Sequence, residues 1–492
     1  MSKKNGKDIA NGTVLSTQVC VIGSGPAGII AAWQLQKAKI KVILIEGSRD
    51  YGSNMQASWP DKFLLYNGEA DGLFATNERE FLVLPYVRHN QPAKERERIF
   101  GGTSTHWGGQ SRPEDPIDLA ERPNFPGWPI TRDELDPYYD QASALCKLHG
   151  DYDLGNNFSA EYWAKILQAE VPSLDGFDVE MYQFIGGDLN FATRKFDGMT
   201  IDESPVDVIL NASVLNINHQ QGSVTELTVA SMDTSIPPKK ATEFTIKADV
   251  YVLACGAVAN ARQLLLSNAG NEHDLVGRYF MCHPLTQSSV ISASSYLNDD
   301  QARLMGGQTP TGQWTDSNGV TVTGRFIPNA EQTSKGIGRC WFWYGWGQYY
   351  YEMTPNPDSR VTLSDKVDPV FLQRQTRITW ELSPLDEQTY DKTTKLYETA
   401  VNNLQGTVSY PPWDTIKSQL VVNGHHLGTT RMWNDPKQGV VDSNLKVYSL
   451  DNLYVAGSSV FPTAGISNPT FTIITLSIRL ADHLKKALTG GS

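Results

Sequence analysis

Residues 19–28 read Val19-Cys20-Val21-Ile22-Gly23-Ser24-Gly25-Pro26-Ala27-Gly28, a short apolar run followed at once by a G-x-G-x-x-G pattern. A helix-like stretch runs on to Leu35, and a second apolar run, 42–45, ends at Glu46. Strand, glycine-rich turn, helix and strand in this order are the context that a dinucleotide-binding fingerprint requires. The sequence therefore predicts a Rossmann-like unit at this end of the chain.

Each residue of the fingerprint has a distinct expected role. Gly23 allows the tight turn, Gly25 lets the backbone approach a pyrophosphate at the helix N-terminus, and Gly28 permits close packing of helix on strand. Glu46 follows Gly25 by 21 residues, where a carboxylate can accept a hydrogen bond from a ribose hydroxyl.

Later segments favour FAD over NAD. Residues 249–268 form another strand, glycine turn and helix, with Ala254 at the end of the strand. A further strand and turn at 452–457 ends in Gly457. These segments are far apart in the sequence but are expected to return to the same nucleotide-binding domain. Such an arrangement is typical of a protein that binds one long cofactor.

The segment 424–484 carries the candidate chemistry. His425 and Asn468 each lie on a turn rich in glycine or proline. A neutral imidazole accepts protons near working pH, and an asparagine amide donates to an oxygen without titrating. Together they could take the proton of an alcohol and hold its oxygen.

Composition limits the class of protein. The chain has 492 residues and a net charge of −12, with no basic stripe for a nucleic acid. Its first twelve residues lack the apolar core of a signal peptide, and the stretch 19–35 is too interrupted to span a bilayer. We expect a cytoplasmic protein, or a periplasmic one only if a partner carries the export signal. Five scattered cysteines without a C-x-x-C pair indicate neither a disulfide framework nor a metal site.

The pattern along the chain predicts two interleaved domains in an α/β (α+β two-domain) fold. Strands are expected within 205–230 and at 320–326, 360–363, 378–382 and 288–294, with a helix at 387–405 and a capping box formed by Thr131 and Glu134. The predicted Rossmann-like FAD-binding domain comprises 1–115, 200–284 and 420–492, and a β-sheet substrate-binding domain comprises 116–199 and 285–419. The aromatic run 341–351 either lines a pocket or packs in an ordinary core.

With its fingerprint at 19–46 and the H-x-x-G-T-x-R-M pattern at 425–432, the chain resembles the glucose–methanol–choline (GMC) flavin oxidoreductases. The resemblance implies that His425 is the catalytic base and Asn468 its partner. The spacing to Gly428 and Arg431 favours His425 over His426. The resemblance weakens across 150–200 and 290–340.

The central motif, 98–109, resembles the family loop that lies against the isoalloxazine ring. It leaves two alternatives for His106: a covalent bond to the flavin, as in choline oxidases and pyranose 2-oxidases, or packing beside the ring. Gly108 departs from the pyranose oxidase pattern, which has a threonine there. The resemblance assigns these residues to the cofactor site: Gly101, Gly102, Ser104, His106, Trp107, Val214, Ala254, Gly457, Ser458, Pro469 and Thr470.

Two other family-like segments are expected to be structural. Asn356, Asp358 and Arg360 lie in a segment similar to E-x-x-P-N-P-x-x-R-V and are expected to fix a turn. His283, in Met-Cys-His-Pro, resembles a turn near the flavin.

The resemblance implies FAD-dependent oxidation of an alcohol, with a secondary hydroxyl of a sugar, glycoside or polyol as the expected substrate. Oxygen, a quinone or a separate protein would accept the electrons. A flavin-containing lyase and a flavin monooxygenase are the alternatives: flavin bleaching by substrate excludes the first, and consumption of NAD(P)H supports the second. A non-enzymatic FAD-binding module would not need the His425–Asn468 pair.

Overall fold

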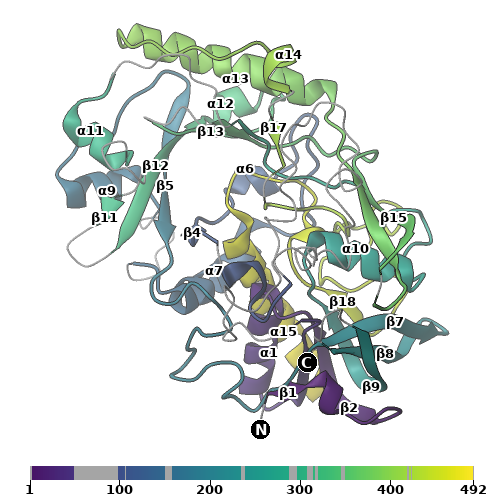
Figure 1. Ribbon diagram of the computed structural model, residues 1–492. Helices are drawn as coiled ribbons and strands as arrows, with labels where there is room; N and C mark the ends of the chain where they lie inside the picture. Colours follow the sequence, from purple (N-terminus) through teal and green to yellow (C-terminus); the bar gives the residue numbers. More distant parts are fainter. Residues whose placement is uncertain are drawn as a thin grey trace.

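The computed structural model describes residues 3–48, 98–105, 107–149, 158–233, 239–286, 296–306, 314–315, 320–344, 349–368, 370–417, 420–422 and 424–490. In this part of the chain two large sheets form the frame of the molecule. The first lies beside the two termini, and the second lies at the other end, beneath the long helix α13 (Figure 1).

The first sheet confirms the predicted Rossmann-like unit. Strands β2 (Val14–Ile22) and β3 (Val42–Ile45) are parallel neighbours joined by helix α1 (Pro26–Lys37), and β9 (Lys239–Leu253) flanks β2 on its other side. The described strands run in the order β1-β6-β3-β2-β9-β8-β7, with β18 parallel to β9. The further strands are β1 (Lys4–Asn5), β6 (Asp207–Leu210), β7 (Ala212–Gln220), β8 (Ser223–Asp233) and β18 (Leu453–Val455).

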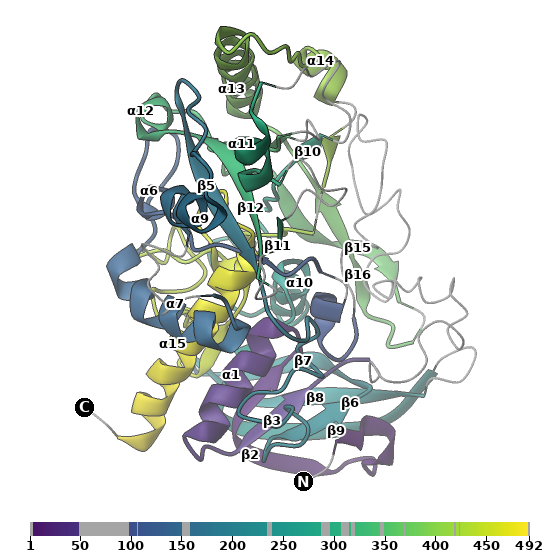
Figure 2. The ribbon, with the colours of Figure 1, turned by 90° about the vertical axis from the view of Figure 1, so that its left-hand side faces the viewer.

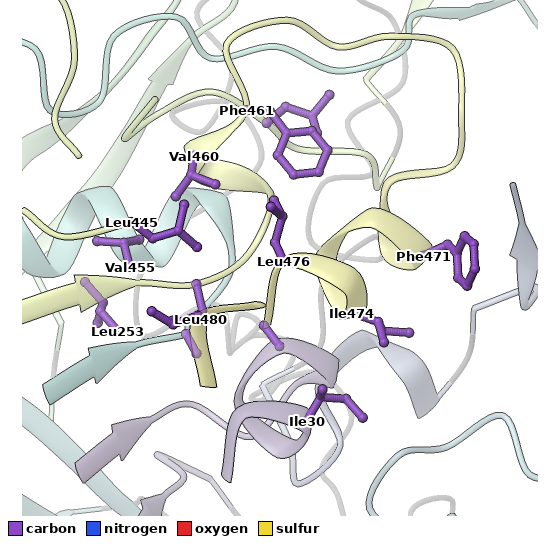
Figure 3. Close-up of a cluster of buried hydrophobic side chains, with 14 of the residues drawn as sticks. Ile30, Leu253, Leu445, Val455, Val460, Phe461, Phe471, Ile474, Leu476 and Leu480 are labelled. Atoms are coloured by element: carbon purple, nitrogen blue, oxygen red, sulfur yellow. The ribbon is translucent and has the colours of Figure 1, made fainter. Parts of the chain in front are cut away.

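Helix α15 (Pro469–Thr489) joins the end of the chain to its beginning. It packs against α1 and against α7 (Arg132–Cys146), as the two ribbon views show (Figures 1 and 2). Its apolar side chains meet those of the first sheet in one buried cluster (Figure 3). The cluster includes Ile30, Leu253, Val455, Leu476 and Leu480. Burial of one such side chain stabilises the fold by roughly 1.5–3 kcal/mol.

The second sheet is antiparallel and confirms the expected β-rich layer. Its central strand β12 (Thr321–Pro328) pairs with β5 (Phe177–Phe184) and β13 (Cys340–Phe342). Helix α13 (Pro384–Asn403) covers one face, where Phe342 stacks on Tyr397 with ring centroids 4.0 Å apart. The remaining described strands are β4 (Gln110–Ser111), β10 (Leu285–Thr286), β11 (Trp314–Thr315), β14 (Tyr349–Tyr351) and β17 (Leu420–Val421).

A separate ribbon, β15 (Arg360–Val367) with β16 (Arg374–Thr379), packs on α10 (Ala257–Leu266) beside the first sheet (Figure 2). Smaller helices complete the described chain: α6 (Pro116–Leu119), α9 (Ala160–Leu167), α11 (Asp299–Leu304), α12 (Ala330–Thr333), α14 (Trp413–Ile416) and the 3₁₀ turns η1 (Gly6–Asp8), η2 (Gly102–Thr105) and η4 (Ser458–Val460). The exact domain boundaries stay a prediction.

The ends of the elements agree with the sequence prediction at one helix cap and differ from it at two other places. Thr131 caps α7 and its backbone N–H donates to Glu134, as predicted. The strand expected at 378–382 is wrong in position, because β16 ends at Thr379 and the chain then turns toward the cap of α13. That helix begins three residues earlier than expected because Ser383 and Asp386 form a capping box. The strand expected at 288–294 lies outside the described residues.

None of the described helices has both the length and the apolar character that crossing a membrane would require.

The contact between α1 and its preceding turn makes the first testable prediction. A Cβ at Gly28 would lie 1.9 Å from the carbonyl oxygen of Gly23, whereas a Cβ at Gly25 would meet nothing within 4 Å. We expect Gly28→Ala to lower the free energy of unfolding by about 2–3 kcal/mol, because helix and strand must separate. Chemical denaturation measures the change. Gly25→Ala is the matched control and should unfold like the wild type without ligand; equal losses would contradict this account.

Candidate active site

The glycine-rich turn is built as an anion-binding site. Gly25 is the N-cap residue of α1, whose first turn has no side-chain cap and no acidic residue. Gly102, from the central motif, comes so close that a Cβ on it would lie 3.0 Å from the Cα of Gly25. Two glycine turns therefore face each other at the positive end of a helix, a place suited to a pyrophosphate.

Glu46, the predicted acceptor for a ribose hydroxyl, lies beside the glycine-rich turn. It follows β3 directly and accepts hydrogen bonds from Ser24 Oγ at 2.6 Å and from the Ser48 amide at 3.0 Å. Burial raises the pKa of this carboxyl, while the hydrogen bond from Ser24 and the charge of Arg98 act in the opposite direction. A carboxylate has further lone pairs, so the residues present fit the ADP half of FAD.

The central motif supports its own loop from within. Ser104 Oγ donates to the Gly101 carbonyl at 2.6 Å and accepts from the Phe191 amide at 3.0 Å. Trp107 Nε1 donates to the carbonyl of Leu189 at 2.9 Å. These polar groups hold the loop in shape. His106 lies outside the described residues, so the choice between a covalent bond and packing stays open.

The other residues assigned to the cofactor lie on or next to β7, β9, η4 and α15, in the half of the molecule that holds the first sheet. Val214 is buried on β7, and Ala254 follows β9. Gly457, with φ +111°, precedes η4, and Ser458 Oγ donates to the backbone carbonyl of His426 at 2.6 Å. Pro469 and Thr470 open α15, whose first turn also lacks a side-chain cap and an acidic residue.

Backbone pairing brings His425 beside His283. Leu427 and Met281 exchange two backbone hydrogen bonds, of 2.9 and 3.1 Å. Gly428 makes this close approach possible, because it has φ +84° and a Cβ there would lie 2.2 Å from the carbonyl oxygen of Tyr279. The two histidines, 142 residues apart in sequence, therefore meet at the ends of paired segments.

Hydrogen bonding determines which nitrogen of each ring carries a proton. His283 Nε2 lies 3.1 and 3.0 Å from the carbonyl oxygens of Ala464 and Gly465, which can only accept, so this nitrogen carries the hydrogen. Neutral His283 then presents a lone pair at Nδ1, 2.9 Å from His425 Nδ1. His425 must donate there, which leaves its Nε2 as the basic nitrogen.

Asn468 completes the arrangement at that basic nitrogen. Its Nδ2 lies 3.2 Å from His425 Nε2 and can donate to the lone pair. Its Oδ1 is buried and has no hydrogen-bond partner among the described residues. The structure thus brings the two predicted catalytic residues together. It also adds His283, which the sequence had indicated only as a structural residue.

The surroundings favour neutral imidazoles. Burial lowers the pKa of His425 well below its usual range, and the neighbouring His283 and His426 add to the shift. Burial also lowers the pKa of His283, opposed by its hydrogen bond to Gly465 and the charge of Glu352. His426 is buried against Phe280, with ring centroids 5.4 Å apart, and the preference for His425 as the base stays a prediction.

The aromatic run divides between the two faces of the second sheet. Trp341 stacks on Tyr350 with centroids 4.1 Å apart, and the Tyr350 ring lies 6.4 Å from that of His425. Phe342 and Tyr349 point to the opposite face, toward α13. Phe342 and Tyr349 therefore pack in an ordinary core, and the lining of a pocket by the Trp341–Tyr350 face stays a prediction. Asn356 fixes a turn, as expected, because its side chain accepts from the Asp358 amide at 3.0 Å.

Comparison with known proteins places this site in a family. Residues 355–477 match the family described as GMC oxidoreductase, and residues 21–81 match the NAD(P)-binding Rossmann-like domain. The chain is 22% identical to 2-methyl-1,2-propanediol dehydrogenase of Mycolicibacterium austroafricanum, over 96% of this chain and 95% of that protein. It is also 22% identical to the fructose dehydrogenase large subunit of Gluconobacter japonicus, over 97% and 99%.

Among solved structures, an FAD-dependent oxidoreductase from Chaetomium thermophilum shares the fold with a TM-score of 0.64 at 15% identity, over 96% of this chain and all of that one. These matches relate the chain to the GMC oxidoreductases, through residues 355–477 and through full-length relatives. It is an FAD-dependent enzyme that acts on the CH–OH group of alcohols or sugars.

The lowered pKa of His425 predicts the pH dependence of the enzyme. The base form exists above a folded-state pKa that lies well below 6.5, so the rate of flavin reduction should be constant from pH 8 down through 6.5 and fall only in more acidic solution. Folding stability should decline below about pH 6.5, because unfolded histidines protonate first. Stopped-flow reduction across pH tests this; a midpoint above 6.5 would contradict it.

Variants of His283 test whether this residue orients the ring of His425 through a hydrogen bond or only fills space beside it. His283→Leu removes the acceptor for His425 Nδ1–H, so the plateau rate should fall at least about tenfold. His283→Asn keeps an oxygen near the position of Nδ1 and should recover much of the rate. Equal losses in both variants, with equal thermal stability, would rule out the orienting role.

Proposed function

We propose that this enzyme oxidises a secondary hydroxyl of a sugar, glycoside or polyol, with His425 as base and Asn468 as the holder of the substrate oxygen. The carrying observation is the buried Asn468 Oδ1, which lacks a partner among the described residues while Nδ2 faces His425. A buried acceptor without a donor is costly, about 1–3 kcal/mol. A substrate with a second hydroxyl next to the reacting one would supply that donor, which supports a polyol or sugar over a simple alcohol.

The proposed chemistry follows from the orientation of the two side chains. The substrate hydroxyl donates to His425 Nε2, and Asn468 Nδ2 turns its hydrogen to the substrate oxygen. His425 takes the proton as the carbon is oxidised, so negative charge never fully develops on the oxygen. The resulting imidazolium keeps its Nδ1–H directed at His283, whose lone pair stabilises it. Bound FAD supplies the hydride acceptor.

The names of two relatives specify a diol and a ketose, which supports a polyol or a sugar as the substrate. The choice of a secondary hydroxyl rests on the resemblance alone, because 2-methyl-1,2-propanediol has none. Electrons would pass on to oxygen, a quinone or a separate protein. A flavin-containing lyase remains the second candidate of this fold, and anaerobic bleaching of the flavin by a polyol would exclude it.

Variants of the three residues test the assignment. His425→Ala should lower the rate of flavin reduction by at least about 10²-fold, because the general base is lost while FAD stays bound. Asn468→Ala should cost less, and His426→Ala least. Anaerobic stopped-flow with a panel of polyols and sugars gives the rates, and flavin absorbance confirms loading. If His426→Ala abolishes reduction and His425→Ala does not, the base has been assigned wrongly.

We also propose that His106 holds the flavin covalently, on the strength of the S-T-H-W motif alone. Acid precipitation should then leave the wild-type flavin with the protein pellet, while His106→Ala should release it to the supernatant. Complete release from the wild type would show that His106 only packs beside the ring.

A further inference from the structure

Arg325 lies on the face of the second sheet that turns toward the catalytic pair. It stands opposite Glu180 in the β5–β12 register, on the same face as Tyr182 and Trp341. This face packs against Ile466, two residues before Asn468. The guanidinium therefore belongs to the layer that faces the reacting end of the site.

The guanidinium is only half satisfied. Its Nη1 donates to Thr323 Oγ1 and to the carbonyl of Gly324. Its Nε and Nη2 are buried and have no hydrogen-bond partner among the described residues, and the whole residue is 0% exposed. Nε–H and Nη2–H lie on the same edge of the planar guanidinium and point in nearly the same direction. A carboxylate can accept one hydrogen bond from each donor of this fork.

The charge of Arg325 also lacks a carboxylate partner in the described chain. Glu180, its cross-strand neighbour, turns its carboxylate to Arg112 instead. The other buried arginines nearby, Arg122 and Arg339, each pair with an acid. Burial lowers the pKa of Arg325 to about 9, so it stays cationic at neutral pH.

The guanidinium of Arg325 is stabilised in part by cation–π contacts with aromatic rings, which surround it. The Arg325 guanidinium carbon lies 3.9 Å from the centroid of the Trp343 ring and 5.0 Å from that of Trp341. Trp341 in turn stacks on Tyr350, beside His425. A series of neighbouring rings thus connects the cation to the base, with Trp341 and Trp343 inclined to each other by 74°. Aromatic faces of this kind suit a sugar ring that carries an anion at one end.

We propose that Arg325 binds the carboxylate of an acidic substrate, a sugar acid or hydroxy acid whose reacting CH–OH group meets His425 and Asn468. This rests on the proposed function and narrows its substrate class. The two donors of one edge match the two oxygens of a carboxylate in a bidentate pair.

Matched pairs of compounds test the carboxylate: glucose with glucuronate, and galactose with galacturonate. With the FAD-loaded enzyme we expect at least one acid to exceed its neutral partner in kcat/KM for flavin reduction. Arg325→Met should lower that advantage by about 10- to 100-fold, and Arg325→Lys should keep only part of it, because the fork is lost. Arg194→Met is the control, since buried Arg194 donates only to the backbone carbonyls of Leu145 and Asp188.

Thermal unfolding gives a reading that does not depend on turnover. The acids should raise the Tm of the loaded wild type more than their neutral partners do, and Arg325→Met should abolish the difference. Equal shifts for acids and neutral compounds, or an acid effect that survives in Arg325→Met, would overturn the proposal. If the acid-specific shift is present but no compound reduces the flavin, the proposed function fails and the carboxylate site stands.

Discussion

The geometry of the site depends on the buried ion pair between the carboxylate of Glu352 and the guanidinium of Arg122. The carboxylate pairs with Arg122 through two hydrogen bonds of 2.9 and 2.8 Å and accepts from the backbone N–H groups of Arg339 and Gly465. The bond to Gly465 fixes the turn whose carbonyls face His283 Nε2, and those carbonyls decide the tautomers of both histidines. A buried ion pair thus sets which nitrogen of His425 is basic. Loss of Glu352 would leave Arg122 buried without a partner, which is strongly destabilising.

Glu114, the acid that lies directly behind this turn, is kept from adding further negative charge there. A Cβ at Gly465 would lie 2.3 Å from Glu114 Oε2, so the Glu114 carboxyl lies directly against the turn. Burial, together with Asp118 and other nearby acids, raises the pKa of Glu114 well above its usual range, and the pKa of Asp118 rises to about 6. A neutral Glu114 leaves Glu352 as the charged group closest to the turn, and the imidazole of His425 can then remain a neutral base.

Much of this arrangement could be predicted from the sequence, because its determinants are local. The glycine fingerprint, the Thr131 cap and the Asn356 turn each depend on residues a few positions apart. The His425–His283 contact could not be predicted in this way, because pairing of segments 142 residues apart creates it. The start of α13 is also local, because Ser383 and Asp386 form a capping box three residues apart. The division of the aromatic residues between two faces of the sheet could not be predicted either. It depends on the register of β12, β13 and β14, which no local sequence pattern determines.

Two buried polar groups near His425 and the aromatic rings differ from the side chains that fix the surrounding turns. Ser458, Thr463 and Ser467, which fix the turns around the catalytic pair, all donate to backbone carbonyls. Asn468 Oδ1 and the Nε–Nη2 edge of Arg325 do not have such partners in the described chain. Leaving them unpaired lowers stability, and the rigid turns allow the fold to tolerate that loss. One acceptor beside the base and one donor fork at the far end of an aromatic surface are complementary to a ligand that carries a hydroxyl at one end and an anion at the other.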